Sequence, residues 1–218
     1  MPDLIASAAA AYAEERTTPF AGSLAHAAAW TETHTGAADM ASGLVEARLL
    51  EALIVAGGAR RVVEIGTFTG VGVLAMAAAL PPDGRVITLE NDPASAAVAR
   101  RHIDGSPYGD RVELIIGDAR QTLARLDGPF DLVYIDAWKA DYPAYYDAVL
   151  PKLSGRGVIV ADNLFRHGLA LNRRSDDPGT RGIHEFGRRV QDDERVHNAL
   201  LTVGDGVMLV WRRPPDAG

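Results

Sequence analysis

The sequence of 218 residues predicts a single α/β domain built on a largely parallel sheet with helices on both faces. Three observations support this fold class. Between residues 61 and 161, short apolar segments alternate with helical ones. The apolar segments contain no regular polar alternation, which is typical of strands buried on both faces. A glycine-rich turn, residues 66–72, joins the first of these strands to the helix that follows it.

The first 56 residues are predicted to form three helices, at 3–16, 21–33 and 40–56. In the third, leucines and an isoleucine recur at helical spacing, and Gly57-Gly58 ends the pattern. We expect these helices to pack on the sheet. These helices could also cover a binding site or form part of a dimer contact.

The alternating region contains five predicted strands and four predicted helices. The strands are apolar and largely β-branched, and Gly, Pro or Asp stands near most helix ends. The first helix is rich in Ala and closes at Pro81-Pro82. The predicted strands are 61–66, 85–90, 111–116, 130–135 and 156–161. The predicted helices are 70–80, 93–103, 118–126 and 141–150.

The remaining residues are predicted to close the sheet. A long polar loop covers 163–178, and loops of this length are often functional. A helix at 179–192 follows. Two strands, 196–203 and 206–211, are separated by Gly204-Asp205 and predict an antiparallel pair.

Composition excludes several classes of protein. The net charge of −7 and the pI of about 5.3 argue against a nucleic-acid-binding protein, which would present a basic face. The absence of Cys excludes disulfides and thiolate chemistry. The first 17 residues are Ala-rich but lack the basic start and apolar core of a signal peptide, and no 18-residue apolar stretch predicts a membrane span. We therefore expect a cytoplasmic location.

The glycine-rich turn is a candidate ligand-binding loop. Gly66, Gly70 and Gly72 have the spacing Gly-x-x-x-Gly-x-Gly, which differs from the Gly-x-Gly-x-x-Gly of dinucleotide-binding proteins. Glycines let the backbone approach a ligand closely, although three turn glycines without a ligand remain an alternative. Glu90 ends the second strand, where an acid can accept hydrogen bonds from a ribose diol.

Two further acids have a ligand-binding and a structural interpretation. Asp118 ends the third strand beside Ala119, where an adenine edge would lie, but it could equally cap the next helix. Glu64 lies inside an apolar strand, and a buried carboxylate needs a partner. A ligand ammonium would serve, and so would a protein Arg or a backbone N–H.

Polar residues follow the fourth and fifth strands, which we expect to be neighbours in the sheet. Asp136 follows one strand, and Asp162 and Asn163 follow the other. Ligands of open α/β sheets bind outside the carboxyl ends of the strands. Carboxylate and amide oxygens suit hard cations such as Mg²⁺ or Ca²⁺. Lys139 stands three residues after Asp136 and is predicted to be a general base, with a surface ion pair to Asp141 as the alternative.

Taken together, five stretches resemble the S-adenosylmethionine-dependent O-methyltransferases of the catechol and caffeoyl-CoA type: residues 64–70, Glu90, and residues 117–119, 135–139 and 161–163. The resemblance covers roughly residues 35 to 213. It implies a Rossmann-like class I methyltransferase fold with a seven-stranded, mostly parallel sheet whose last strand is antiparallel. The core would be residues 61–213, with residues 1–56 as extra helices covering the site. It also implies a divalent metal, usually Mg²⁺ (or Ca²⁺ or Mn²⁺), and a homodimer.

The resemblance also implies roles for individual residues. The cofactor would be lined by Met40, Ser42, Glu64, Gly66, Thr67, Phe68, Gly72, Glu90, Asn91, Asp118, Ala119 and Asp136. The metal would be held by Asp136, Asp162 and Asn163, with Lys139 as the base. The residues expected to face the substrate are Met40, Trp138, Lys139, Asn163, Arg166 and His167.

Four residues depart from the pattern of one or both types in the family, and they concern the acceptor and the methionine end of the cofactor. Gly72 replaces a Ser that in relatives helps to bind the methionine carboxylate. Arg166-His167 replaces a Trp-Ser pair of the caffeoyl-CoA type. Trp138 matches the catechol type better. The aromatic or apolar walls of an acceptor site could come from Phe165, Trp138, Trp30 and Met40, each of which could instead be ordinary packing.

The predicted function is transfer of the methyl group of S-adenosylmethionine to a hydroxyl of a small catechol-like or vicinal-diol acceptor. A hydroxyacyl acceptor linked to a carrier or to CoA is an alternative. The basic loop with Arg166, Arg173 and Arg174 could meet a phosphate of such a carrier, or it could simply be solvated. An NAD(P)-dependent oxidoreductase would leave the acids and the lysine after the fourth and fifth strands unexplained. A non-catalytic cofactor-binding module would be favoured only if those carboxylates were missing.

Overall fold

The strands of the computed structural model, which describes residues 2–37 and 40–214, form one seven-stranded sheet. The strand order is β3-β2-β1-β4-β5-β7-β6. Neighbours from β3 to β5 are parallel, and β7 is antiparallel to both β5 and β6. The strands are β1 (Arg61–Ile65), β2 (Arg85–Glu90), β3 (Val112–Ile116), β4 (Phe130–Ile135), β5 (Leu153–Ala161), β6 (Val196–Leu201) and β7 (Val207–Arg212).

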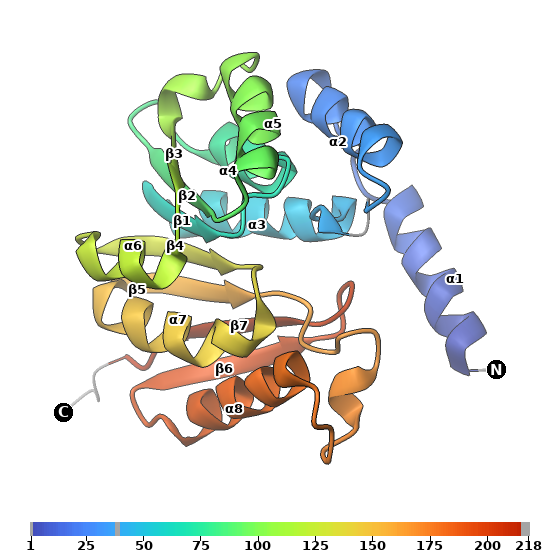
Figure 1. The fold of residues 1–218 in the computed structure, drawn as a ribbon, viewed down its shortest axis with the longest axis vertical. Helices are drawn as coiled ribbons and strands as arrows, with labels where there is room; N and C mark the ends of the chain where they lie inside the picture. The colour runs from blue at the N-terminus through green and yellow to red at the C-terminus, as the bar shows by residue number, and fades with distance from the viewer. Residues whose placement is uncertain (1, 38–39, 215–218) are drawn as a thin grey trace.

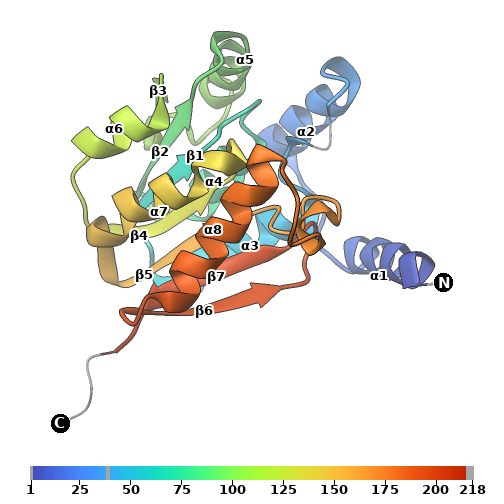
Figure 2. The same ribbon diagram turned by 60° about the horizontal axis from the view of Figure 1, so that its bottom comes forward.

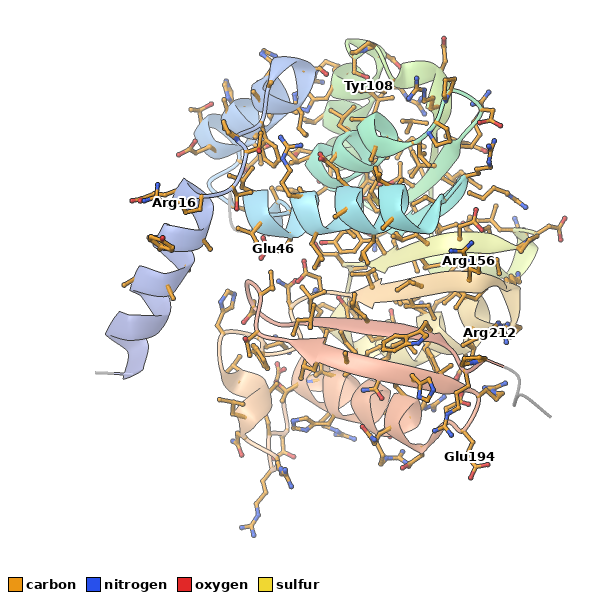
Figure 3. All side chains as sticks on the ribbon, turned by 180° about the vertical axis from the view of Figure 1, so that it is seen from behind. Arg16, Glu46, Tyr108, Arg156, Glu194 and Arg212 are labelled. Atoms are coloured by element: carbon orange, nitrogen blue, oxygen red, sulfur yellow. The ribbon has the colours of Figure 1, made fainter. Side chains whose placement is uncertain are left out.

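Helices cover both faces of the sheet (Figures 1 and 2). The helices are α1 (Pro2–Glu15), α2 (Gly22–His34), α3 (Leu44–Gly57), α4 (Val71–Ala79), α5 (Pro93–Asp104), α6 (Ala119–Arg125), α7 (Tyr142–Val149) and α8 (Pro178–Asp192). Figure 3, seen from behind, shows α3 lying across one face, and α6, α7 and α8 lie on the other. No helix in the described part of the chain has the length and apolar character needed to span a bilayer.

The core is divided by the sheet into two buried clusters. Because side chains alternate along a strand, Val62 of β1 packs with α3 and α4, and the adjacent Val63 packs with α7 and α8. Both valines are essentially inaccessible to solvent. The predicted buried, mostly parallel sheet with helices on both faces is therefore confirmed.

Two predicted boundaries differ from the structure by three residues or more. The third helix begins at Leu44 rather than residue 40, because Gly43 caps it with extended backbone, φ −64° and ψ 165°. The fifth strand begins at Leu153 rather than residue 156. A register shift against β4 lies between Phe130 and Leu132, and a side chain at Gly157 would meet the carbonyl oxygen of Phe130 at 2.7 Å. The predicted loop 163–178 contains a 3₁₀ turn, η5 (Leu169–Leu171).

Helix α8 is fixed to α7 by an aromatic cluster, and this contact gives a stability prediction. Phe186 is fully buried, and its ring centroid lies 5.7 Å from that of Tyr142 and 5.9 Å from that of Tyr146. Phe186→Ala should lower the free energy of unfolding by about 3–5 kcal/mol, measured by urea denaturation. Leu171→Ala, at a side chain that is 75 % exposed, is the control and should change it by less than about 0.5 kcal/mol.

Candidate active site

A cavity of about 950 Å³ lies at the carboxyl ends of β1, β2, β4 and β5. The chain runs from β1 outward through β2 to β3 and then returns to place β4 on the other side of β1. The strand order therefore reverses between β1 and β4. Ligands of doubly wound sheets bind at such a switch point. All but one of the predicted site residues line this cavity, and the exception is Asp162.

The glycine-rich loop forms one wall of the cavity through backbone that few other residues would tolerate. Gly66 and Gly70 have φ of 101° and 95°, and only glycine adopts such angles readily. A side chain at Gly66 would collide with the carbonyl oxygen of Asp136. A side chain at Gly72 would collide with the Glu64 carboxylate and would come within 2.9 Å of Ser42 Oγ. The loop therefore leaves an open cradle beside Glu64 and Ser42.

Glu90 is held in place by the backbone. Its Oε2 accepts a hydrogen bond of 2.7 Å from the N–H of Phe68, and its Oε1 accepts bonds of 2.9 Å from the N–H groups of Asn91 and Asp92. Glu90 is buried, with only 8 % of the residue exposed. Each oxygen has further lone-pair capacity, so a fixed Glu90 could still accept bonds from a diol in the cavity.

Glu64 is buried with a hydroxyl partner rather than with the Arg or backbone N–H considered as alternatives. The Thr88 hydroxyl donates to Glu64 Oε2, so the Thr67 hydroxyl must donate to Thr88. Burial raises the pKa of Glu64 well above its ordinary value, and the bond from Thr88 offsets this only in part. Its Oε1 faces the open cradle at Gly72, where a ligand ammonium would stabilise the carboxylate.

Asp118 caps a helix, which was one of the two roles predicted for it beside contact with an adenine. It is the N-cap of α6 and accepts a bond of 2.8 Å from the N–H of Arg120. Its other oxygen pairs with the Arg120 guanidinium at 2.7 Å. Asp118 and Ala119 both line the cavity, so contact with an adenine stays a prediction beside the confirmed cap.

The polar residues after β4 and β5 do meet. Lys139 Nζ lies 2.8 Å from Asp136 Oδ1, 2.8 Å from Asn163 Oδ1 and 2.8 Å from the Tyr142 hydroxyl. The alternative pairing of Lys139 with Asp141 is wrong, because Asp141 pairs with Arg120. The lysine side chain is only 16 % exposed. Lys139 is thus held at the wall of the cavity.

This set of oxygens has the chemistry of a hard-cation site. Asp136 and Asn163 converge on one positive charge, the ammonium of Lys139. Asp162 is 3 % exposed, and burial followed by the charge of Asp136 raises its pKa to about 7. Two close carboxylates of this kind are stabilised by a cation. No group of three or more His, Asp or Glu among the described residues forms such a centre, so the set depends on the amide of Asn163.

Backbone geometry aims the residues of the loop after β5. Asn163, Arg166 and His167 have positive φ angles of 56°, 48° and 52°. Asn adopts this left-handed conformation more readily than most residues. The Arg166 guanidinium pairs with Asp177, the N-cap of α8, and the N–H of His167 donates to Asp205 at 2.8 Å.

Two of the four candidate apolar wall residues line the cavity. They are Met40 and Trp138, which are 58 % and 59 % exposed. Trp30 is elsewhere, in a separate cavity beside α5. Phe165 packs against Gly206 in the turn between β6 and β7. The cover over the site comes from residues 40–42, between α2 and α3, rather than from the helices themselves.

Three residues of the site were not predicted. Tyr134 donates to Asp162 Oδ2 at 2.6 Å, and Tyr142 contacts Lys139. Burial, with the charges of Asp136 and Asp162, raises the pKa of Tyr142 well above its ordinary value. Asp205 lines the cavity, and its Oδ2 has no partner among the described residues. Sequence features that could have indicated these residues are the position of Tyr134 just before Asp136, the position of Tyr142 just after Lys139, and the Gly204-Asp205-Gly206 turn.

The open cradle at Gly72 gives a prediction. Gly72→Ala should weaken the binding of S-adenosylhomocysteine about tenfold or more, because the added methyl group must displace Glu64 or Ser42. Isothermal titration calorimetry measures the change. Gly57→Ala, where a side chain would have nothing within 4 Å, is the control and should leave binding unchanged. Equal affinities for the two variants would show that the cradle lies outside the ligand site.

Comparison with known proteins agrees with this geometry. Residues 19–213 match the model of a family described as O-methyltransferase. This chain belongs to the O-methyltransferase family. A catechol O-methyltransferase of Niastella koreensis is 38 % identical over 148 residues, 66 % of each sequence. A catechol O-methyltransferase of Mycobacterium tuberculosis is 47 % identical over 121 residues, 55 % of this chain and 54 % of the relative. The chain therefore spans about two-thirds or less of the length of these two family members.

A solved structure of the family matches almost the whole chain. It is an O-methyltransferase from Streptomyces achromogenes, involved in tomaymycin synthesis and solved in complex with SAM. The TM-score is 0.87 at 29 % identity, over 95 % of this chain and 96 % of that one. The predicted Rossmann-like methyltransferase fold is thereby confirmed.

Proposed function

We propose that this chain transfers the methyl group of S-adenosylmethionine to one hydroxyl of a small catechol-like acceptor, assisted by a divalent cation. One observation carries the proposal. A single cavity combines an open glycine cradle beside a buried Glu64 with Asp136, Lys139 and Asn163, which converge at 2.8 Å contacts. The first group suits an amino-acid-bearing cofactor, and the second suits activation of a hydroxyl.

The cofactor would be held along the ends of β1, β2 and β3. Glu90 would accept hydrogen bonds from the ribose hydroxyls, and Glu64 would face the ammonium group across Gly72. Asp118 and Ala119 would lie at the adenine. When bound, S-adenosylmethionine supplies a methyl group on a sulfonium, which an oxygen nucleophile attacks in line. The chain's own contribution is to hold both partners in that geometry.

A cation would be held by Asp136, Asp162 and Asn163, for which Mg²⁺ is the first candidate and Ca²⁺ or Mn²⁺ the others. A cation held there would make a nearby acceptor hydroxyl more acidic and would orient it. Lys139 stands beside two of these ligands, at 2.8 Å from each. It would take the hydroxyl proton, and the Tyr142 hydroxyl, also at 2.8 Å, would keep its amine in position.

The acceptor would lie against Met40 and Trp138, two half-exposed apolar side chains on the cavity wall. A flat catechol-like ring suits such walls better than a long carrier. The ion pair of Arg166 with Asp177 also leaves less basic charge for a carrier phosphate.

The homodimer and the cytoplasmic location stay predictions, and light scattering would test the first of them.

Two measurements test the proposal. Titration with S-adenosylhomocysteine should show saturable binding, and titration with NADH should show none. Incubation with methyl-labelled S-adenosylmethionine and a panel of vicinal diols should then label at least one of them. Binding of NADH without binding of S-adenosylhomocysteine would favour an oxidoreductase. Binding of S-adenosylhomocysteine without transfer to any diol would favour another acceptor class or a non-catalytic module.

A further inference from the structure

Helices α2 and α5 lie near each other (Figure 1). Residues of both line a second cavity of about 860 Å³, outside the site described above. Tyr108, labelled in Figure 3, contributes to its wall from the segment after α5. The chemically important residues of its lining are Gly22, Ser23, His26, Trp30, Arg101 and His102. None of them belongs to the cofactor, cation or acceptor sets.

Three of these side chains form a set of flat rings. The centroid of His102 lies 5.3 Å from that of Trp30 and 6.1 Å from that of His26, in edge-to-face arrangements. Trp30 also stacks on His34, with centroids 4.6 Å apart and planes 3° apart. Ring walls placed in this way favour a planar aromatic guest, which can make offset or edge contacts with them.

The charge of the cavity is opposite to that of the protein. The whole chain carries −7, yet none of the described residues that line this cavity is Asp or Glu. The Arg101 guanidinium lies 5.9 Å from the Trp30 ring centroid. The first turn of α2 also faces the cavity at Gly22 and Ser23, and Ala21 gives this turn no side-chain cap. Backbone N–H groups at a helix start favour anions.

The wall between the two cavities is fixed by a short hydrogen-bond chain. His102 Nδ1 donates to the carbonyl oxygen of Thr69 at 2.8 Å, and Thr69 lines the cofactor cavity. Behind it, the buried hydroxyls of Thr69 and Thr31 lie 2.7 Å apart. The rings of the second cavity therefore back directly onto the glycine-rich loop while facing a different space.

We propose that this cavity binds a planar aromatic anion, such as an aromatic carboxylate, separately from the cofactor and the acceptor. The aromatic ring would lie against Trp30 and His102. The carboxylate would face Arg101 and the N–H groups at the start of α2. Size, flat walls and charge carry the assignment, and it does not depend on the reaction proposed above.

The test uses naphthalene-2-carboxylate and its neutral match, naphthalene-2-carboxamide, titrated into ¹⁵N-labelled protein without and with excess S-adenosylhomocysteine. The chain has three tryptophans, and their indole N–H signals report on different places. Trp30 lines the second cavity and Trp138 the first. We expect the carboxylate to shift the Trp30 signal saturably, with the same affinity in the absence and in the presence of S-adenosylhomocysteine. We expect the carboxamide to bind at least tenfold more weakly.

Matched variants locate the anion. Arg101→Gln should weaken the carboxylate about tenfold and bring it close to the carboxamide. Arg125→Gln, an exposed arginine on α6, should leave the affinity unchanged. The proposal is overturned if the carboxylate moves the Trp138 signal instead of the Trp30 signal, or if S-adenosylhomocysteine displaces the carboxylate. It is also overturned if the unaltered protein binds the carboxamide as tightly as the carboxylate, or if the Arg101→Gln variant binds the carboxylate as tightly as the unaltered protein does.

Discussion

Lys139→Ala is expected to lower kcat by about 10²–10⁴-fold, the usual contribution of a positioned general base. Lys139 Nζ lies 2.8 Å from Asp136 Oδ1 and 2.8 Å from Asn163 Oδ1, on the wall of the cavity. It therefore stands where an acceptor hydroxyl would lose its proton. The affinity for S-adenosylhomocysteine should change little, because all the predicted cofactor residues except Asp136 lie away from the end of β4. Steady-state kinetics and calorimetry measure the two quantities.

Lys139→Arg separates a base from a merely structural cation. Arginine keeps the positive charge beside Asp136 but does not give up a proton in proteins. A base role predicts that Lys139→Arg is as slow as Lys139→Ala and that raising the pH partly restores both, because more of the acceptor is then already ionised. A fast Lys139→Arg variant, or wild-type kcat in Lys139→Ala at neutral pH, would leave hydroxyl activation to the cation alone.

Asp162→Asn should produce the second large effect, a loss of about 10–100-fold in activity at limiting Mg²⁺. Asp162 is 3 % exposed and accepts hydrogen bonds of 2.6 Å from Tyr134 and from the N–H of Asn163. The substitution keeps the shape and removes the charge that would hold a cation. More Mg²⁺ should be needed for half-maximal activity. Asp147→Asn, on the surface of α7, is the control and should keep the Mg²⁺ dependence of the unaltered protein.

The strands of the parallel region and the position of the site follow from features that are local in the sequence. The five strands from β1 to β5 were predictable because each contains a run of apolar, largely β-branched residues, bounded by residues that favour turns or helix caps. Asp136 and Asn163 were predictable partners because the carboxyl ends of neighbouring parallel strands meet at one edge. The start of β5 was missed because Gly155 and Gly157 disfavour a strand, and close packing against Phe130 overrides that preference.

Residues that depend on long-range packing could not be placed from the sequence. Trp30 lies on a helix whose position against α5 is set by tertiary contacts, so its ring lies in the second cavity instead of the acceptor site. Tyr134 lies inside an apolar strand, where the sequence pattern indicates only packing, yet its hydroxyl reaches Asp162. Asp205 is a turn residue by pattern, and only the folding of the β6–β7 hairpin brings it to the cavity.

The central claim, cation-assisted methyl transfer to one of two adjacent hydroxyls, is tested most directly by one rate comparison. Methyl-labelled S-adenosylmethionine is incubated with 3,4-dihydroxybenzoate or with 4-hydroxybenzoate, after exhaustive EDTA treatment and again after Mg²⁺ is restored. We predict label on the dihydroxy acceptor only, lost with EDTA and recovered with Mg²⁺. Full activity after chelation, or equal labelling of the monohydroxy compound, would contradict the account.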